Sequence, residues 1–206
     1  METAEINRAS LWDGTNHETL VFQDVDTPDG MAVDVNGRNL FWTDTDTKRI
    51  EMIRLDGTYR RIIISHDLDA PRDISLDTVN GWIYWSDWGT NPRIGIRRKK
   101  ACLKKIGPVY LNYTSNNYLY FDISLLIERA WMDGTHREII VKEDIAWPNG
   151  IAVDIQEQKI YWCDAKMDRI EVANVDGSNR YIVLSYNITH PFGLSVLGNY
   201  IYWTGM

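Results

Sequence analysis

The sequence has few of the residues that carry common catalytic or metal-binding motifs. Its 206 residues include only two cysteines, Cys102 and Cys163, which provide neither a disulfide framework nor a CxxC metal signature. The four histidines show no HExxH or other paired-ligand spacing, and no GxSxG, P-loop or dinucleotide fingerprint occurs. The sequence therefore predicts a protein that is not an enzyme and that holds no metal and no cofactor.

Long apolar runs and basic residues are also scarce. No apolar run approaches the roughly 18 residues of a membrane span, and the first ten residues are too polar for a signal peptide. The 22 basic residues are outnumbered by 29 acidic ones, and six of the basic residues fall in the segment 95–127. The rest of the chain carries a net charge of −12, which argues against a nucleic-acid partner and favours cationic ligands.

What is abundant is apolar and aromatic, and it repeats. Apolar residues make up 44% of the chain, including nine Trp and eleven Tyr, which is typical of a globular protein. Four prolines that each begin an apolar run are spaced 43, 77 and 43 residues apart, and four Asp-Gly pairs have the same spacing. The prolines are Pro28, Pro71, Pro148 and Pro191.

Each repeat unit reads as a four-stranded antiparallel meander. Four short β-rich runs are separated by turn residues such as Asn36-Gly37 and Asp56-Gly57. In the second run, "FWTD", "IYWSD" and "IYWCD" place bulky residues on both pleat faces, because neighbours in a strand alternate sides. Sheets that must be buried on both faces pack radially between two others, so the units predict an all-β propeller.

The second runs also carry a family resemblance. Phe41-Trp42-Thr43-Asp44 and its three counterparts resemble the YWTD (LDL-receptor class B) repeats. The phrases "YWSDWGTNPRI", "WPNGIAVDIQEQKIYWCDAK" and "HPFGLSVLGNYIYWT" look like the propellers of the LDL-receptor-related Wnt co-receptors five and six. The resemblance implies a YWTD-type β-propeller of six four-stranded blades.

The chain accounts for about four of those six blades, so we expect an incomplete propeller with an irregular insertion. Residues 1–26 would supply strands three and four of one blade, and residues 190–206 strands one and two. Together these ends would make one composite blade, or would leave an open arc with exposed edges. The complete units are 27–69, 70–145 and 146–189, the second of them interrupted by 95–127. We interpret the chain as a fragment or an incomplete gene product.

One face of the predicted propeller collects the candidate ligand-binding residues. In a meander, the entry to strand one and the exit of strand two lie on the same face, which brings together Asp29, Trp88, Trp147, Asn149, His190 and Phe192. Aromatic residues mixed with acids and an amide are typical of a protein-binding hot spot. The alternative is structural: Trp147 and Phe192 fill the seam between blades, and Asn149 makes a turn.

The resemblance implies what this face would bind. In the family it binds Wnt proteins and secreted antagonists, whose Asn-x-Ile segment is held by the Asn of the "WPNG" loop. Asn149 is that residue here, Trp147 lies beside it, and His190 and Phe192 match antagonist contacts. The implied protein is the extracellular part of a plasma-membrane receptor, next to an EGF-like module. The segment itself would contact neither membrane nor nucleic acid.

Two rival functions remain open at this stage. An LDL-receptor-like endocytic receptor would release cargo on acidification, and His190 is the only histidine on the candidate face. A propeller hydrolase of the gluconolactonase type would need carboxylate, Asn and His metal ligands at the central axis, where the strand-one residues are mostly apolar.

The remaining predictions concern structure and modification. The YWTD carboxylates Asp44, Asp87 and Asp164 are expected to lock adjacent blades by accepting hydrogen bonds from backbone or from a nearby Arg-Ile pair. Two sequons, at Asn112 and Asn187, permit glycosylation of a secreted chain.

The insertion 95–127 breaks the composition of the chain. Removing it joins Arg93-Ile94 to Glu128 inside strand three, which favours a retained intron or a gene-model artefact. The alternative is a true loop on the ligand face, with "ISLLIERAW" supplying a second register for strand three.

Overall fold

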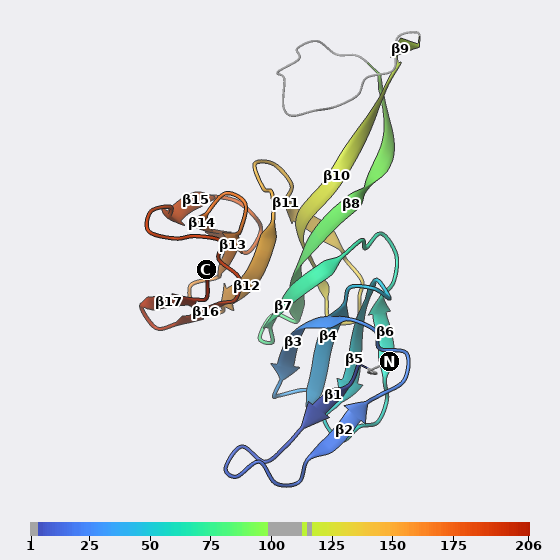
Figure 1. The fold of residues 1–206 in the computed structure, drawn as a ribbon, viewed down its shortest axis with the longest axis vertical. Coiled ribbons are helices and arrows are strands. Elements are labelled where there is room, and N and C mark those ends of the chain that lie inside the picture. Colours follow the sequence, from blue (N-terminus) through green and yellow to red (C-terminus); the bar gives the residue numbers. More distant parts are fainter. Residues whose placement is uncertain (1–3, 99–112, 115–116) are drawn as a thin grey trace.

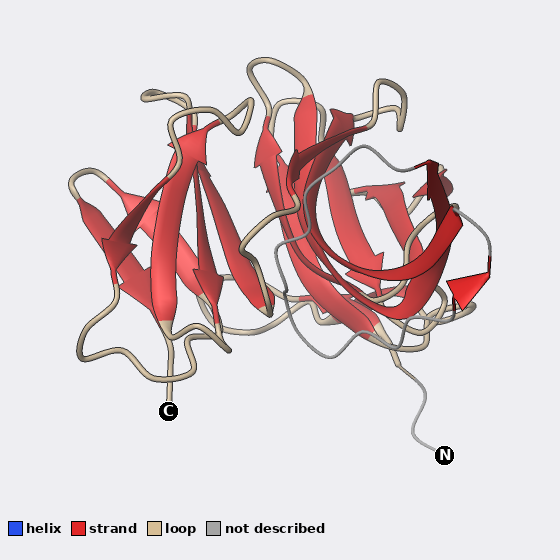
Figure 2. Ribbon diagram, turned by 90° about the horizontal axis from the view of Figure 1, so that it is seen from above, coloured by secondary structure: helices blue, strands red, loops and turns tan. Residues whose placement is uncertain are grey.

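The strands form five antiparallel sheets that stand side by side in an open arc (Figures 1 and 2). The computed structural model describes residues 4–98, 113–114 and 117–206, and all regular elements in these ranges are β-strands. Three sheets are complete blades, which we number first to third along the chain, and a two-stranded half-blade flanks them at each end. The predicted partial propeller of four-stranded blades is confirmed.

The strand bounds follow the repeat. The N-terminal half-blade contains β1 (Ile6–Arg8) and β2 (Glu18–Val21). The first blade contains β3 (Pro28–Asp34), β4 (Asn39–Asp44), β5 (Arg49–Arg54) and β6 (Arg61–Ile64). The second blade contains β7 (Pro71–Asp77), β8 (Trp82–Arg98), β10 (Asn117–Trp131) and β11 (Glu138–Val141), with β9 (Tyr113–Thr114) paired to β10. The third blade contains β12 (Pro148–Asp154), β13 (Lys159–Asp164), β14 (Arg169–Asn174) and β15 (Tyr181–Leu184), and the C-terminal half-blade contains β16 (Leu194–Leu197) and β17 (Tyr200–Trp203).

The hydrophobic core lies between the blades, because each blade buries both of its faces. Phe41 packs in a cluster with Trp85 and Ile74 of the second blade, whereas its neighbour Trp42 packs with Ile6 of the N-terminal half-blade. Trp42, Trp85 and Trp162 are all fully buried. The alternation of aromatic residues in the second strands therefore fixes which side of each blade meets which neighbour.

The first strands of the blades line the inner side of the arc, where the backbones of neighbouring blades approach closely. A Cβ added at Gly30 would lie 2.5 Å from the Arg72 carbonyl oxygen, and one at Gly150 would lie 2.5 Å from the Leu194 nitrogen. The Gly150 N–H donates to the Phe192 carbonyl across this seam at 2.7 Å. Only glycine fits at these two positions, which keeps the entry loops of adjacent blades together.

The structure places the insertion between strands two and three, whereas the comparison of the repeats placed it inside strand three. Leu126 and Ile127 pair with Asp87 and Ser86, as Arg49 and Ile50 pair with Asp44 and Thr43 in the first blade. Strand three of the second blade is therefore continuous, and the preferred join of Arg93-Ile94 to Glu128 is wrong. The register that uses "ISLLIERAW" is the one the structure adopts.

The extra residues lengthen the connection between strands two and three into a hairpin. Strands β8 and β10 stay paired as far as Arg98 and Asn117, and the hairpin projects beyond the blades (Figure 1). Lengthening a turn keeps the hydrogen-bond ladder of the blade intact, whereas splitting a strand would interrupt it.

The two ends of the arc remain apart. Strands β1–β2 and β16–β17 are separate two-stranded sheets, so the composite blade that the sequence allowed does not form within one chain. The open arc with free strand edges is the arrangement observed (Figure 1).

Candidate functional site

The YWTD carboxylates hold the segment that leads into each blade. Asp44 accepts hydrogen bonds from the backbone N–H groups of Asp26 (2.9 Å), Thr27 (3.2 Å) and Thr47 (3.0 Å). Burial raises the pKa of Asp44, but these bonds outweigh burial and bring the pKa below its usual value. The partners are backbone groups of the same blade's entry and exit loops, not the Arg of the Arg-Ile pair.

Asp87 and Asp164 have the same role in the next two blades. Asp87 accepts from the backbone of Asp69 and Ala70, and Asp164 from that of Ala146 (2.6 Å) and Trp147 (3.0 Å). Burial dominates at Asp87 and raises its pKa. The last repeat has Gly205 in this position and so lacks a carboxylate.

The residue before each carboxylate connects its blade to the next one. The side chains at this position donate to a carbonyl in the following blade's entry loop: Thr43 to Arg72, Ser86 to Asn149 at 2.9 Å, and Cys163 to Phe192 at 3.2 Å. Cys163 is fully buried, and burial raises the pKa of its thiol to about 12. The residue at the third position of the YWTD motif therefore donates a hydrogen bond from its own blade to the next one.

Four predicted residues form a continuous row on the entry face, which we call the aromatic row: Trp88, Trp147, His190 and Phe192. Trp88 and Trp147 stack with centroids 5.9 Å apart, His190 meets Trp147 edge-on at 6.0 Å, and Phe192 lies 5.8 Å from His190. Trp147 is 39% exposed and Phe192 53% exposed. The row extends from the second blade across the third blade to the C-terminal half-blade, so the ring packing joins three neighbouring sheets on this face.

Two cations that the sequence analysis missed lie over this row. The Arg72 guanidinium sits 4.3 Å from the Trp88 ring centroid and pairs with Asp29 at 2.6 Å. The Lys166 ammonium lies 5.4 Å from the Trp147 ring. The sequence could have indicated both residues by their places in the repeat, because Arg72 follows the entry proline and Lys166 lies two residues after the YWTD carboxylate. The face thus carries two cations over its rings, and one of them, Arg72, is paired with a carboxylate.

Asn149 occupies a different position from the aromatic row. Asn149 is only 4% exposed, and its Nδ2 donates a hydrogen bond to the Pro191 carbonyl at 3.0 Å. It borders a cleft of about 200 Å³ that Asp29, Arg72 and Phe192 also line. One amide N–H and the amide oxygen remain for a ligand that enters the cleft.

Asp73 lines the same cleft. It stands where the other three entry loops have glycine. Its carboxylate accepts from the Ile151 and Ile74 N–H groups, each at 2.9 Å, and burial raises its pKa. Between the second and third blades the Asp73 side chain therefore makes the contact that a close backbone approach at Gly30 or Gly150 makes between the other blades.

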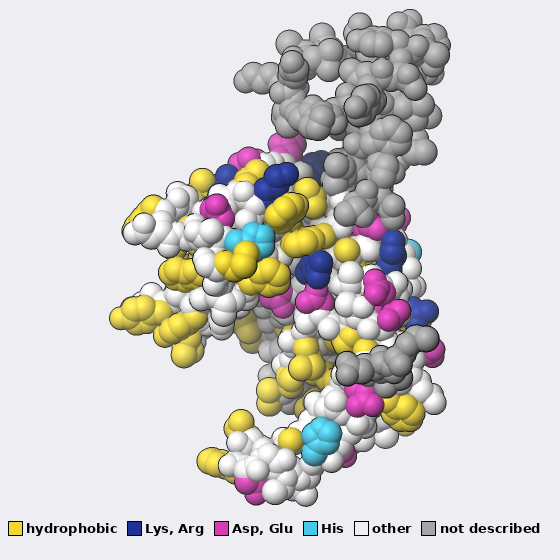
Figure 3. Space-filling model, in the orientation of Figure 1, with side chains coloured by type: hydrophobic (Ala, Val, Ile, Leu, Met, Phe, Trp, Pro, Cys, Tyr) yellow, Lys and Arg dark blue, Asp and Glu magenta, His cyan; other side chains and the backbone are white. Residues whose placement is uncertain are grey.

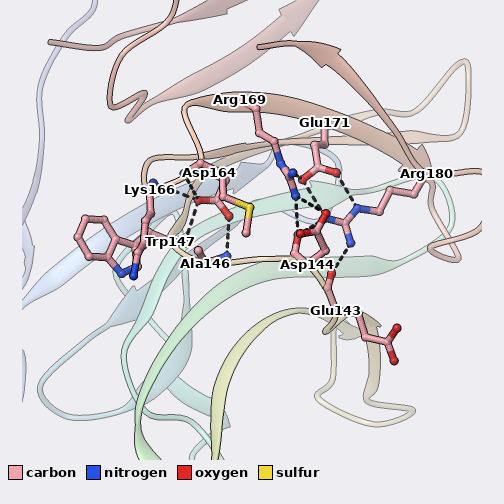
Figure 4. A network of polar contacts seen from close by, with 10 residues as sticks. Glu143, Asp144, Ala146, Trp147, Asp164, Lys166, Arg169, Glu171 and Arg180 are labelled. Carbon is pink, nitrogen blue, oxygen red and sulfur yellow. Dashed lines mark hydrogen bonds and ion pairs between the residues drawn. The ribbon is translucent and has the colours of Figure 1, made fainter. Parts of the chain in front are cut away.

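A buried Glu–Arg–Trp network repeats under the face and was missed by the sequence analysis. In the third blade Arg180 forms a two-pronged ion pair with Glu171 (2.7 and 2.8 Å) and contacts the Glu143 and Asp144 carbonyls (Figure 4). Its guanidinium also lies 5.2 Å from the Trp162 ring centroid. The Glu51–Arg60 and Glu128–Arg137 pairs repeat this arrangement. A constant nine-residue spacing between Glu and Arg was the signal in the sequence.

The two sequons lie in different parts of the chain. Asn187 is exposed in the loop before β16, and Asn112 lies outside the described residues. Within the described part, no group of three or more His, Cys, Asp or Glu side chains could hold a metal ion. The described residues also form no helix long and apolar enough to cross a bilayer.

Comparison with known proteins identifies the repeats. The family model "Low-density lipoprotein receptor repeat class B" matches residues 38–78, 120–155 and 158–196. The chain is 36% identical over 203 residues to "Low-density lipoprotein receptor-related protein 5-like protein" of Homo sapiens, covering 98% of this chain and 67% of that protein. It is 44% identical over 180 residues to "Low-density lipoprotein receptor-related protein 5" of Mus musculus, covering 85% of this chain and 9% of that protein.

A solved structure shows the same fold. A chain in the crystal structure of a Nidogen/Laminin complex superposes with a TM-score of 0.77 at 31% identity, covering 98% of this chain and 64% of that chain. The chain therefore spans about two thirds of a related propeller and a small part of the full-length mouse receptor. On the repeats, the fold and these relatives, the chain belongs to the low-density lipoprotein receptor class B repeat family.

Proposed function

We propose that the chain is an extracellular ligand-binding propeller of an LDL-receptor-related Wnt co-receptor, and that it binds Wnt proteins or secreted antagonists through its entry face. The observation that carries the proposal is the aromatic row, whose four rings contact one another across two blades and the C-terminal half-blade. Exposed aromatic residues that are held rigidly and flanked by a guanidinium are typical of binding hot spots. The relatives with "receptor-related" in their names support the same function.

The row offers a ligand both apolar surface and directional groups. An extended segment could lie on Trp147 and Phe192 while a polar side chain enters the cleft beside Asn149. Since Trp88 donates its Nε1–H to the Pro148 carbonyl at 2.6 Å, its ring is fixed before a ligand binds. A preformed surface loses little conformational entropy on binding.

The decisive experiment measures the affinity of an antagonist peptide containing Asn-x-Ile. We expect Trp147→Ala to weaken binding by about 30-fold, which corresponds to the roughly 2 kcal/mol of a hot-spot aromatic residue. Tyr181→Ala is the matched control, because Tyr181 is 57% exposed on the outer strand β15. Unchanged affinity for a Trp147→Ala protein with the wild-type circular dichroism spectrum would refute the proposal.

Asn149→Ala is a less informative variant because it also removes the hydrogen bond to Pro191 that joins two blades. A glycan at Asn187 is part of the same proposal for an extracellular chain. It would appear as a mass shift that peptide N-glycosidase removes from protein secreted by cultured cells.

A further inference from the structure

The seam between the second and third blades is held by side chains of strand β7. Strands β7 and β12 lie side by side along this seam (Figure 1). The Asp73 carboxylate accepts a hydrogen bond from the Ile151 N–H at 2.9 Å. Two residues further along β7, the Ser75 hydroxyl accepts one from the Val153 N–H at 3.1 Å. Since N–H groups alternate in direction along a strand, both N–H groups belong to the edge of β12 that faces away from β13.

The first and third blades lack both of these acceptors. Where the second blade has Asp73, they have Gly30 and Gly150, and where it has Ser75 they have alanine. The second carboxylate oxygen of Asp73 accepts from the Ile74 N–H at 2.9 Å, which fixes the side chain to its own strand. One carboxylate group therefore holds the backbones of two blades, and among the three complete blades only the second supplies such a group.

These bonds act on the loop that carries two of the candidate ligand-binding residues. The ladder between β12 and β13 shifts register just before Ile151, so the third blade itself holds this loop loosely. The second blade holds it instead: Ser86 donates to the Asn149 carbonyl at 2.9 Å, and Asp73 accepts from the next anchored residue, Ile151. Gly150, which has the most backbone freedom, lies between these two anchors. The bond to Ile151 therefore limits how far the loop can move.

The same seam carries the stacked pair of the aromatic row. Trp88 of the second blade donates its Nε1–H to the Pro148 carbonyl at 2.6 Å, and its ring stacks on Trp147 with centroids 5.9 Å apart. Hydrophobic, basic and histidine side chains gather over the adjoining second and third blades (Figure 3). The geometry of the stack therefore depends on how β12 lies against β7.

We propose that Asp73 is a positioning residue for ligand binding. Together with Ser75 it fixes β12 against β7, and so it preforms the loop that presents Trp147 and Asn149. This inference rests on the proposed function of the aromatic row. A preformed loop spares the ligand the cost of ordering it, so loss of Asp73 should lower affinity while every ring of the row is retained.

Hydrogen exchange measured by NMR on the full chain tests the positioning without a ligand. Asp73→Ala should speed the exchange of the Ile151 amide, which loses its acceptor. It should also speed the exchange of the Trp88 indole N–H, although the acceptor of that group is the Pro148 carbonyl and not Asp73. The Ala152 amide lies on the β13 side of the strand and is the internal control, so its exchange should stay slow.

Asp77→Ala is the matched control variant. Asp77 is a fully buried carboxylate on the same strand, but the backbone N–H groups that it accepts from, those of Val79 and Asn80, belong to its own turn. Both variants should lose folding stability. Only Asp73→Ala should speed the two exchanges and weaken binding of the Asn-x-Ile peptide, by about tenfold, which is the scale of ordering two side chains on binding.

Several outcomes overturn the proposal. Unchanged exchange of the Ile151 amide or of the Trp88 indole in Asp73→Ala would mean that Asp73 does not position the loop, and unchanged peptide affinity would mean that the position does not matter for binding. If the wild-type chain does not bind the peptide, the proposed function fails, and the exchange of the indole still decides the positioning. Should Asp73→Ala not fold, Ser75→Ala should speed the exchange of the Val153 amide and of the same indole, and an unchanged indole then overturns the proposal.

Discussion

Loss of the arginine that pairs with the buried glutamate should destabilise the first blade more than the third. Arg60 and Arg180 hold equivalent positions, and each pairs with a glutamate side chain that is 2–3% exposed. Glu171 has a second cation, since Arg169 Nε lies 2.9 Å from its Oε1. Within the described residues, Arg49, the equivalent residue of the first blade, forms no ion pair with Glu51. Of these two changes, Arg60→Met alone therefore leaves a buried carboxylate without a cation.

The magnitudes follow from the two environments. Breaking a buried ion pair and leaving one charge unpaired costs about 3–5 kcal/mol, which is the expectation for Arg60→Met. Arg180→Met should cost about 2 kcal/mol, the scale of one charge-assisted hydrogen bond. Both arginines also donate to two backbone carbonyls and lie over a Trp ring, so these losses cancel in the comparison. Methionine retains an apolar side chain over the ring.

Urea unfolding followed by tryptophan fluorescence measures the difference, provided that the slopes of the transitions agree. The double variant Arg169→Met/Arg180→Met should lose at least as much stability as Arg60→Met, because Arg169 also binds Asp144. Lys48→Met is the control, because the Lys48–Asp69 pair has an exposed lysine and should contribute under about 1 kcal/mol. Equal losses for Arg60→Met and Arg180→Met would refute the reasoning.

Three further predictions concern titratable groups. Cys163 should not react with a thiol reagent at pH 8 until the chain unfolds, and Cys163→Thr should keep the stability within about 1 kcal/mol, as Thr43 makes the same contact. Two YWTD carboxylates should affect acid stability in opposite directions. The lowered pKa of Asp44 means that wild type loses folding free energy as the pH falls through this pKa, so Asp44→Asn should lose less stability in acid than wild type. The raised pKa of Asp87 means that its protonation favours the folded state, so Asp87→Asn should lose more stability in acid than wild type, and acid titrations of both variants test this. Peptide affinity of the chain should be flat between about pH 7.4 and 5.5, since the proposed co-receptor does not need to release its ligand on acidification, and a loss of affinity over this range would favour the endocytic-receptor alternative.

The repeat made most of the fold predictable. Proline and Asp-Gly spacing placed the blades, and the alternation of aromatic residues predicted burial on both faces, which Trp42 and Phe41 show. The register of the second blade was not predictable in the same way. Arg93-Ile94 and Leu126-Ile127 both fit strand three locally, and only the pairing with β8 and the burial of Ile127 decide between them.

The candidate site was predictable as a set of positions but not as a set of contacts. Meander geometry placed Trp88, Trp147, His190 and Phe192 on one face, and the structure joins them in a row. It did not indicate that Asn149 is buried against Pro191. Nor did it indicate that Arg72 and Lys166 lie over the rings, since the distance between two side chains on different blades depends on how the blades pack.

The sequence by itself determined the repeat and the strand order within each blade, because these depend on local spacing. Tertiary structure decided which strands of the interrupted blade pair, whether the ends of the arc meet, and how charge is distributed on the entry face. Each of these depends on residues far apart in the chain, whose relative positions are set by the packing of whole sheets.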